Sequence, residues 1–388
     1  MLRVRNASHY RVIADEEHYY SESSIVQLGN GDLLVSSPDN RGLAHTDAGS
    51  VVLSRSKDCG RTWTNHPRQF LFKAGSSDGY SSGPLSLLAD GTVLCHADHL
   101  RYLVRVGDIS YIAPRGNSEH GTAYLTRSDD GGETWAAPWP ARTIPMQGCF
   151  VRDGILELPD GALLMPLSGT RRTISQRLPN DDDAFRSYLL RSDDRGEIWY
   201  YYSAIALDPA GVLNLWEPAI ARLSTGRIVA LLRSDYVHMI APPGGDLYSC
   251  YSDDDGASWS IPHRTPLWGY PADLITLKDG GVLATYGYRR DPLSIRVAFS
   301  KDGTTWAKED AAVLRTIPLR SQEQTGPSFA ALSPSPELST LNVGFRHIGY
   351  PDSKQLADGR IATVYHMWDE GLRQCVECTV WDVEIGSA

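Results

Sequence analysis

The chain has 388 residues, of which 41% are hydrophobic and 22% charged, a composition typical of a globular protein with a large core. Its formal net charge of -10 argues against nucleic acid or an anionic membrane as a partner. No apolar run reaches membrane-spanning length, so a transmembrane protein is not expected either.

The first residues, Met1 to Asn6, contain no apolar segment of the secretion-signal type, which favours a cytoplasmic location. The six cysteines are scattered, and only Cys375 and Cys378 form a CxxC pair. If this pair lies in a strand, its thiols face opposite sides. Reduced core cysteines are therefore expected in place of a zinc or redox site.

The first predicted element is a β-hairpin over residues 25–35, in which Asn30-Gly31 separates two apolar runs. Asn-Gly and Asp-Gly between apolar runs are the strongest short hairpin signal. The pattern occurs six times, at residues 25–35, 85–95, 155–165, 220–231, 274–284 and 353–364.

A second motif follows the first five hairpins and reads Ser56-x-Asp58-x-Gly60-x-x-Trp63 in its first copy. The other copies begin at Ser128, Ser192, Ser252 and, in a shortened form, Ser300. The Ser and Asp side chains can accept hydrogen bonds from local backbone N–H groups, Gly supplies a positive φ, and Trp packs back over the sheet. Five such turns, spaced by about 65 residues, indicate a repeat architecture.

Each repeat holds an inner and an outer hairpin, so we predict an all-β fold, a single six-bladed β-propeller over residues 1–388 with four-stranded antiparallel blades. The last blade lacks the Trp turn. We expect the N-terminal run 2–13 and the C-terminal run 375–385 to share it and close the ring. Long insertions at 106–121, 170–186, 236–247 and 307–347 are the loops where binding is expected.

Residues just before each inner hairpin should face the central channel. Nine positions ahead of the turn glycine, the six repeats carry Glu22, Ser82, Arg152, Glu217, Pro271 and Tyr350. Four of the six are ionisable or phenolic, although apolar strands follow them. A purely structural position would show one small or apolar residue type, so the mixture favours a site built from one residue per blade.

At this point the chain resembles the sialidase superfamily, in which the Ser-x-Asp-x-Gly-x-x-Trp turns are known as Asp boxes. The segment from Trp216 to Arg233 is similar to the family segment that holds a Glu and ends in a substrate-binding Arg. The segment from Gly349 to Arg360 is similar to the one that carries the family's nucleophilic Tyr.

The resemblance implies roles for these residues. Tyr350 would attack the sugar in place of a carboxylate, because the family's sugar itself carries a carboxylate that would repel one. Glu217 would act as its base. Asp47, ahead of the first Asp box, would protonate the leaving oxygen and then activate water. Arg233, together with Arg289 or Arg290, would pair with the sugar carboxylate.

One departure from the family is plain. Sialidases begin the first blade with an Arg-Ile-Pro segment whose Arg completes a triad, but here the matching segment, 20–24, carries Glu22. An unpaired Glu22 would repel a sugar carboxylate, whereas pairing with Arg152 or Arg233 would remove that objection. The resemblance therefore implies a glycan-directed site whose sugar need not be sialic acid.

The leading expectation is an exo-acting glycoside hydrolase that binds carbohydrate and needs no cofactor. The histidines are dispersed and form no helical metal motif, so no metal is expected. Three alternatives stay open: Glu22 and Glu217 as acid and base on another sugar, a polysaccharide lyase, or a non-catalytic glycan-binding propeller. The oligomeric state is also open.

Overall fold

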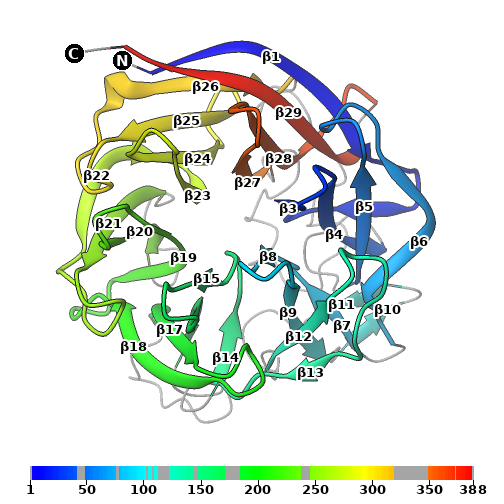
Figure 1. The fold of residues 1–388 in the computed structure, drawn as a ribbon, viewed down its shortest axis with the longest axis horizontal. Coiled ribbons are helices and arrows are strands. Elements are labelled where there is room, and N and C mark those ends of the chain that lie inside the picture. The colour runs from blue at the N-terminus through cyan, green and yellow to red at the C-terminus, as the bar shows by residue number, and fades with distance from the viewer. Residues whose placement is uncertain are drawn as a thin grey trace.

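Short apolar strands that alternate with glycine turns fold into six antiparallel sheets around a central axis, as Figure 1 shows. This computed structural model confirms the predicted six-bladed propeller. The residues that it describes are 2–41, 49–75, 78–101, 104–106, 109–111, 122–143, 147–170, 184–236, 245–318, 348–371 and 373–386.

In blades 1 to 5 the strands run in chain order from the channel outward, whereas the outermost strand of blade 6 comes from the N-terminus. Blade 1 holds β2 (His18–Tyr20), β3 (Ser24–Gln27), β4 (Leu33–Arg41), β5 (Ser50–Ser56) and β6 (Thr64–Phe72). Blade 2 holds β7 (Asp78–Ser81), β8 (Leu85–Leu87), β9 (Val93–Arg101), β12 (Thr122–Ser128) and β13 (Trp139–Pro140). Blade 3 holds β14 (Gln147–Phe150), β15 (Leu156–Glu157), β16 (Leu163–Thr170), β17 (Arg186–Ser192) and β18 (Tyr200–Ala206).

Blade 4 holds β19 (Leu213–Arg222), β20 (Ile228–Tyr236), β21 (Asp246–Ser252) and β22 (His263–Trp268). Blade 5 holds β23 (Tyr270–Thr276), β24 (Val282–Tyr288), β25 (Ser294–Ser300) and β26 (Ala311–Thr316), with the short 3₁₀ turn η3 (Lys308–Asp310) before β26. Blade 6 holds β27 (Gly349–Gln355), β28 (Ile361–Trp368), β29 (Gln374–Ile385) and β1 (Leu2–Ile13). A separate ribbon pairs β10 (Val104–Val106) with β11 (Ile109–Tyr111).

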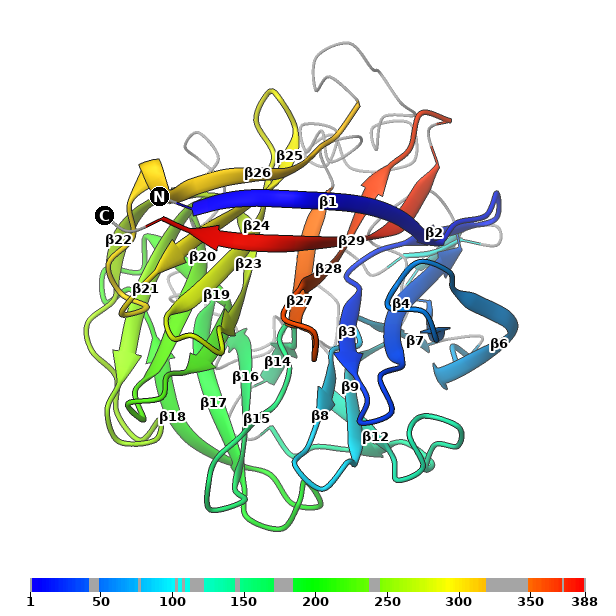
Figure 2. The same ribbon diagram turned by 45° about the horizontal axis from the view of Figure 1, so that its top comes forward.

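The two ends of the chain close the ring. The N-terminal strand β1 is the outermost strand of blade 6 and pairs antiparallel with the C-terminal strand β29, from Leu2 opposite Ile385 to Ile13 opposite Val376. Figure 2 shows the two strands side by side, with the termini close together. The predicted closure is therefore confirmed, and it satisfies the strand edge that an open sixth blade would expose.

The Asp-box turns form as expected from their residue types. In the first copy, Ser56 Oγ accepts a hydrogen bond from the Gly60 N–H at 2.9 Å, and Asp58 Oδ1 accepts one from the Thr62 N–H at 2.8 Å. The Trp63 indole donates to the Gly60 carbonyl at 3.0 Å, and Gly60 has a φ of 85°. These turns lie between the two outer strands of a blade, away from the channel.

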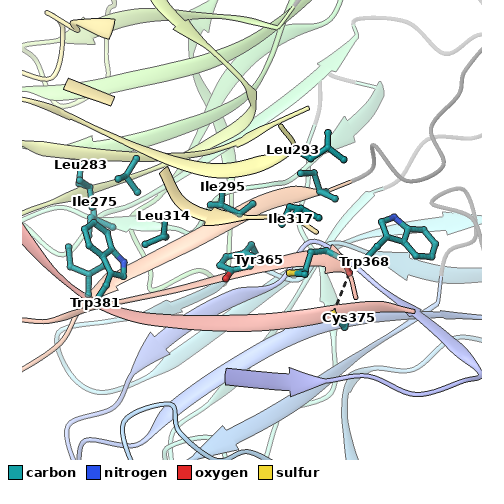
Figure 3. Close-up of a cluster of buried hydrophobic side chains, with 14 of the residues drawn as sticks. Ile275, Leu283, Leu293, Ile295, Leu314, Ile317, Tyr365, Trp368, Cys375 and Trp381 are labelled. Atoms are coloured by element: carbon teal, nitrogen blue, oxygen red, sulfur yellow. Dashed lines mark hydrogen bonds between the residues drawn. The ribbon is translucent and has the colours of Figure 1, made fainter. Parts of the chain in front are cut away.

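Apolar clusters fill the spaces between neighbouring blades. In the cluster between blades 5 and 6, Ile275 and Leu283 pack with the fully buried Tyr365 and Trp381 (Figure 3). Cys375 belongs to this cluster, whereas Cys378 packs on the opposite face, between blades 6 and 1. Both thiols are free, and they face opposite sides of β29, as predicted.

Side-chain oxygens also link neighbouring blades beside the channel. In five of the six junctions, an oxygen near the start of one inner strand accepts the N–H at the equivalent place of the next blade. The donor and acceptor pairs are Ile25 to Asp352 (3.0 Å), Leu85 to Ser24 (2.9 Å), Ile155 to Ser86 (2.6 Å), Ile220 to Asp153 (2.8 Å) and Ser353 to Asp273 (2.8 Å). These bonds fix the relative positions of the inner strands.

We expect Ser86→Ala to lower the free energy of unfolding by about 1–3 kcal/mol, because the buried Ile155 N–H then loses its acceptor. Urea denaturation measures the change. Ser224→Ala, at an exposed serine, is the matched control and should change stability by less than about 0.5 kcal/mol. Equal effects of the two changes would contradict the structural role of the inter-blade bond.

Candidate active site

Four of the six residues that lie nine positions before a turn glycine have an unusual backbone conformation. Glu22, Ser82, Glu217 and Tyr350 have φ values of 45°, 63°, 48° and 45°, in the left-handed region that residues other than glycine seldom adopt. In blades 4 and 6 these residues lie at register shifts of the innermost strand pair. A bulge of this kind re-aims a side chain, which explains why one repeat position contributes to the site in several blades.

Tyr350 and Glu217 are directly hydrogen-bonded to each other. The Tyr350 hydroxyl donates to Glu217 Oε1 at 2.8 Å, although the two residues belong to blades 6 and 4. Burial and the Glu217 charge raise the pKa of Tyr350 above its ordinary value. Burial alone would raise the pKa of Glu217, but the charges of Arg233 and Arg152 outweigh it and lower that pKa. Near neutral pH the pair is therefore a neutral phenol beside a carboxylate.

Arg233 holds the other oxygen of Glu217. Its Nη1 lies 2.8 Å from Glu217 Oε2 and 3.4 Å from the Tyr350 hydroxyl, and its Nε donates to Asp235 Oδ2 at 2.8 Å. The guanidinium lies between the rings of Trp216 and Tyr270, each 4.5 Å from ring centroid to Cζ. Asp235 also accepts from the Trp216 indole and the Tyr270 hydroxyl, both at 3.1 Å. Arg233 is thus fixed in place.

Arg152 is shared by three carboxylates. Its Nη1 lies 3.4 Å from Glu22 and 3.2 Å from Asp98, and its Nε lies 3.5 Å from Glu217. Glu22 is therefore paired with Arg152, one of the two arginines expected as its partner. Asp98 is fully buried, and burial raises its pKa to about 7 despite the Arg152 charge. The Asp98 carboxylate also accepts the Val151 N–H at 2.9 Å.

The two adjacent arginines of blade 5 differ. Arg289 lies beside Tyr350, with its Cζ 5.6 Å from the Tyr350 ring centroid and 5.2 Å from that of Tyr270, and its Nε donates to the Ile348 carbonyl at 3.0 Å. Burial lowers the pKa of Arg289, and the Arg233 charge adds to that effect. Arg290 is exposed and stacks instead on Trp268, at 3.9 Å. The geometry therefore places Arg289, and not Arg290, in the candidate site.

Three site residues do not follow from the repeat alignment: Asp98, Asp235 and His366. His366 Nδ1 accepts the Glu22 N–H at 3.1 Å, and its ring stacks on Tyr350 with centroids 5.5 Å apart. In the sequence, Asp98 could have been found as a charged residue within the run that forms β9. Asp235 could have been found by its i, i+2 spacing from Arg233, which puts both on one face of a strand. Asp47 and most of the long predicted insertions lie outside the described residues, so the acid/base role of Asp47 stays a prediction.

A small pocket lies beside Tyr350 and Glu217, between the inner strands of the blades. Glu22, Arg152, Glu217 and Tyr350 line it, together with Asp153, Asp273 and Asp352 further along the inner strands. Within the described ranges, no group of three or more His, Cys, Asp or Glu side chains is arranged to hold a metal ion. The same ranges contain no helix long and apolar enough to span a membrane.

The three aspartates of this pocket affect stability in a pH-dependent way. Burial raises the pKa of all three aspartates, that of Asp153 to about 7. For Asp273, repulsion by the other two carboxylates adds to the rise. The Lys354 charge offsets part of the rise in each residue. The folded state therefore binds more protons than the unfolded chain between the ordinary Asp pKa and the raised values. Stability should fall as the pH rises through this window.

We expect Asp273→Asn to lessen that fall, because the amide oxygen still accepts the Ser353 N–H without adding charge. Urea midpoints at about pH 5 and about pH 8 measure the effect: the wild type should lose more stability between them than the variant. The exposed Asp279→Asn is the control and should follow the wild type. Identical slopes for Asp273→Asn and the wild type would contradict the raised pKa values.

Comparison with known families shows to which family the chain belongs. A family model described as the BNR repeat-like domain matches residues 109–363, more than half of the chain. The chain belongs to the BNR repeat-like domain family. No curated protein matches its sequence.

Solved structures share the fold of this BNR repeat-like protein. A protein of unknown function from Dyadobacter fermentans is 22% identical, with 99% of each chain covered and a TM-score of 0.76. The NanB sialidase of Streptococcus pneumoniae is 13% identical, with 96% of this chain and 70% of that chain covered and a TM-score of 0.63. An α-L-arabinanase of Penicillium chrysogenum, solved with arabinobiose, is 16% identical, with 97% and 98% covered and a TM-score of 0.62. At these identities the likeness shows the fold, which is common to sialidases and arabinanases.

Proposed function

We propose that this BNR repeat-like protein is an exo-acting glycoside hydrolase in which Tyr350 is the nucleophile and Glu217 its base. The observation that carries the proposal is the 2.8 Å hydrogen bond from the buried Tyr350 hydroxyl to an ionised Glu217, formed across the channel by two blades. A nucleophile within hydrogen-bond reach of its base, itself oriented by Arg233, is the usual arrangement of covalent catalysis. The solved relatives named above include a sialidase and an arabinanase, both of which act on glycans.

The chemical steps follow from these positions. The Tyr350 oxygen attacks the anomeric carbon as the glycosidic C–O bond breaks, and the phenolic proton passes to Glu217 Oε1. The leaving oxygen takes a proton from the general acid, for which Asp47 is the predicted residue. Water then attacks the glycosyl-tyrosine and gives a proton to the deprotonated general acid, for which Asp47 is the predicted residue. The phenolate leaves and recovers its proton from Glu217, and the sugar is released with retained configuration.

The alternative in which Glu22 and Glu217 act as acid and base fits less well. Arg152 contacts both carboxylates, at 3.4 and 3.5 Å, and so occupies the space between them that a sugar would need. The charges of Arg233 and Arg152 also lower the pKa of Glu217, which keeps it in the ionised form and not in the protonated form that a general acid needs.

The test begins with a screen of the purified protein against chromogenic terminal glycosides of neutral, uronic and sialic sugars. On the substrate found, we expect Glu217→Gln to lower kcat by about 10²-fold, because the phenol then lacks a base. Glu309→Gln, at an exposed position on η3, is the control and should keep full activity. Full turnover by Glu217→Gln would rule out this role, and sugar binding without turnover by the wild type would favour a non-catalytic glycan-binding propeller.

A further inference from the structure

The charged groups of the candidate site are already paired with one another. Two of its three partly buried arginines contact protein carboxylates. Arg152 contacts those of Glu22, Asp98 and Glu217, and Arg233 contacts those of Glu217 and Asp235. Arg233 meets its two partners at 2.8 Å each. A sugar carboxylate would therefore have to compete with these protein carboxylates for both guanidinium groups.

Arg289 contacts no carboxylate among the described residues. Its Nε donates to the Ile348 carbonyl, and its buried Nη2 has no hydrogen-bond partner there. This Nη2 group can donate to a hydroxyl or ring oxygen of a bound sugar.

The charge balance points the same way. Four carboxyl groups, those of Glu22, Asp98, Glu217 and Asp235, face the guanidinium groups of Arg152, Arg233 and Arg289. A bound sugar carboxylate would add a further negative charge to a site whose acids already equal or outnumber its bases, and uncompensated like charges at an interface cost several kcal/mol.

We propose that the sugar bound at this site is uncharged, and that Glu22 is the residue that excludes a carboxylate. This inference rests on the proposed function, since it names the substrate class of the same site. Glu22 acts by engaging Arg152 at 3.4 Å and by placing its own negative charge at the first-blade position where the sialidase resemblance requires an arginine.

The site supplies the contacts that a neutral sugar needs. The carboxylate oxygens of Glu22 and Asp235 accept hydrogen bonds from sugar hydroxyls, and Arg289 Nη2 donates one. A row of partly exposed aromatic rings also lies beside the arginines: Phe150 to Phe185 at 5.8 Å, and Phe185 to Trp216 at 4.9 Å between centroids. An apolar wall with a few fixed polar groups is typical of small-molecule sites.

The decisive experiment separates binding from turnover. Tyr350→Phe, which keeps all the charges of the site, is titrated calorimetrically with 4-nitrophenyl glycosides in matched pairs, glucoside with glucuronide and galactoside with galacturonide. Arabinofuranoside, xyloside and rhamnoside are added as neutral ligands and N-acetylneuraminic acid as a second anion. We expect binding by at least one neutral ligand, and at least about tenfold weaker binding by each charged member of a pair than by its neutral partner.

Glu22→Gln, made in the same background, should strengthen binding of the charged sugars by at least about tenfold, because it frees a cation and removes an anion. Glu309→Gln is the matched control and should leave every affinity unchanged. Its thermal melt, compared with that of Glu22→Gln, shows whether the latter is folded.

Tighter binding of a charged sugar than of its neutral partner would overturn the inference but leave the proposed hydrolase intact. The same conclusion would follow if no neutral ligand bound and the wild type hydrolysed a charged glycoside. An unchanged affinity for anions in Glu22→Gln would overturn the role of Glu22. Binding of neutral sugars with no turnover by the wild type would refute the proposed hydrolase but support the inference about the ligand.

Discussion

Tyr350→Phe should lower kcat for the hydrolysed glycoside by about 10⁴-fold and leave a folded protein, because it removes the attacking oxygen and little else. Glu217 keeps Arg233 at 2.8 Å and Arg152 at 3.5 Å as partners for its charge, so no buried ion is left unpaired. The lost hydrogen bond should lower the free energy of unfolding by only about 1 kcal/mol. Steady-state kinetics and a urea titration on the same preparation measure both quantities.

Tyr365→Phe is the matched control for this change. Tyr365 is also fully buried, and its hydroxyl bonds Thr379 Oγ1 at 2.6 Å, but it lies in the apolar cluster between blades 5 and 6, away from the channel. It should show a similar loss of stability with unchanged kcat. If Tyr350→Phe and Tyr365→Phe have the same kcat, Tyr350 is not the nucleophile.

Arg152→Leu should lower the free energy of unfolding by about 3–5 kcal/mol, because it leaves Glu22, Asp98 and Glu217 without the cation that they share. Asp98 is fully buried, and its carboxylate would then have only the Val151 N–H among the contacts described for it. Adding Glu22→Gln to Arg152→Leu should recover part of the loss, since it removes one uncompensated charge. Urea denaturation of the single and double variants gives the coupling energy.

Arg264→Leu is the control for a solvent-exposed ion pair. Arg264 lies 2.7 Å from Asp246, but its side chain is 65% exposed, so the change should cost no more than about 1 kcal/mol. A loss of that small size for Arg152→Leu as well would show that the three carboxylates do not depend on Arg152.

The fold was predictable because its determinants are local and repeated. Asn30-Gly31 and the turn from Ser56 to Trp63 specify hairpins through their own side chains and φ values, and six spaced copies leave few alternatives to a closed ring. The pairing of β1 with β29 also followed, because a blade without an Asp box needs an outer strand from elsewhere in the chain.

The candidate site was only partly predictable. Glu22, Arg152, Glu217 and Tyr350 share one repeat position, and an inner-strand backbone that is left-handed at three of them aims side chains at the channel. Counting along the repeat therefore found them. Asp98 and Asp235 escaped because their role depends on contacts made by single arginines, which no period in the sequence records.

The choice between Arg289 and Arg290 shows the same limit. Both follow β24 directly and are equally plausible from sequence spacing. Tertiary packing decides between them, because the Ile348 carbonyl holds Arg289 next to Tyr350, whereas Arg290 stacks on Trp268. The contact with Ile348 could not be predicted from the sequence, because Ile348 is far from both arginines in the chain.

The most direct test of the account is to trap the covalent intermediate. The wild type is incubated with the 2-deoxy-2-fluoro glycosyl fluoride of the sugar that it hydrolyses, digested, and analysed by mass spectrometry. We predict that the peptide containing Tyr350 gains the mass of one fluorosugar, and that Tyr350→Phe gains none. A fluorosugar attached to Glu217 or Glu22, or a product of inverted configuration with no adduct, would contradict Tyr350 as the nucleophile.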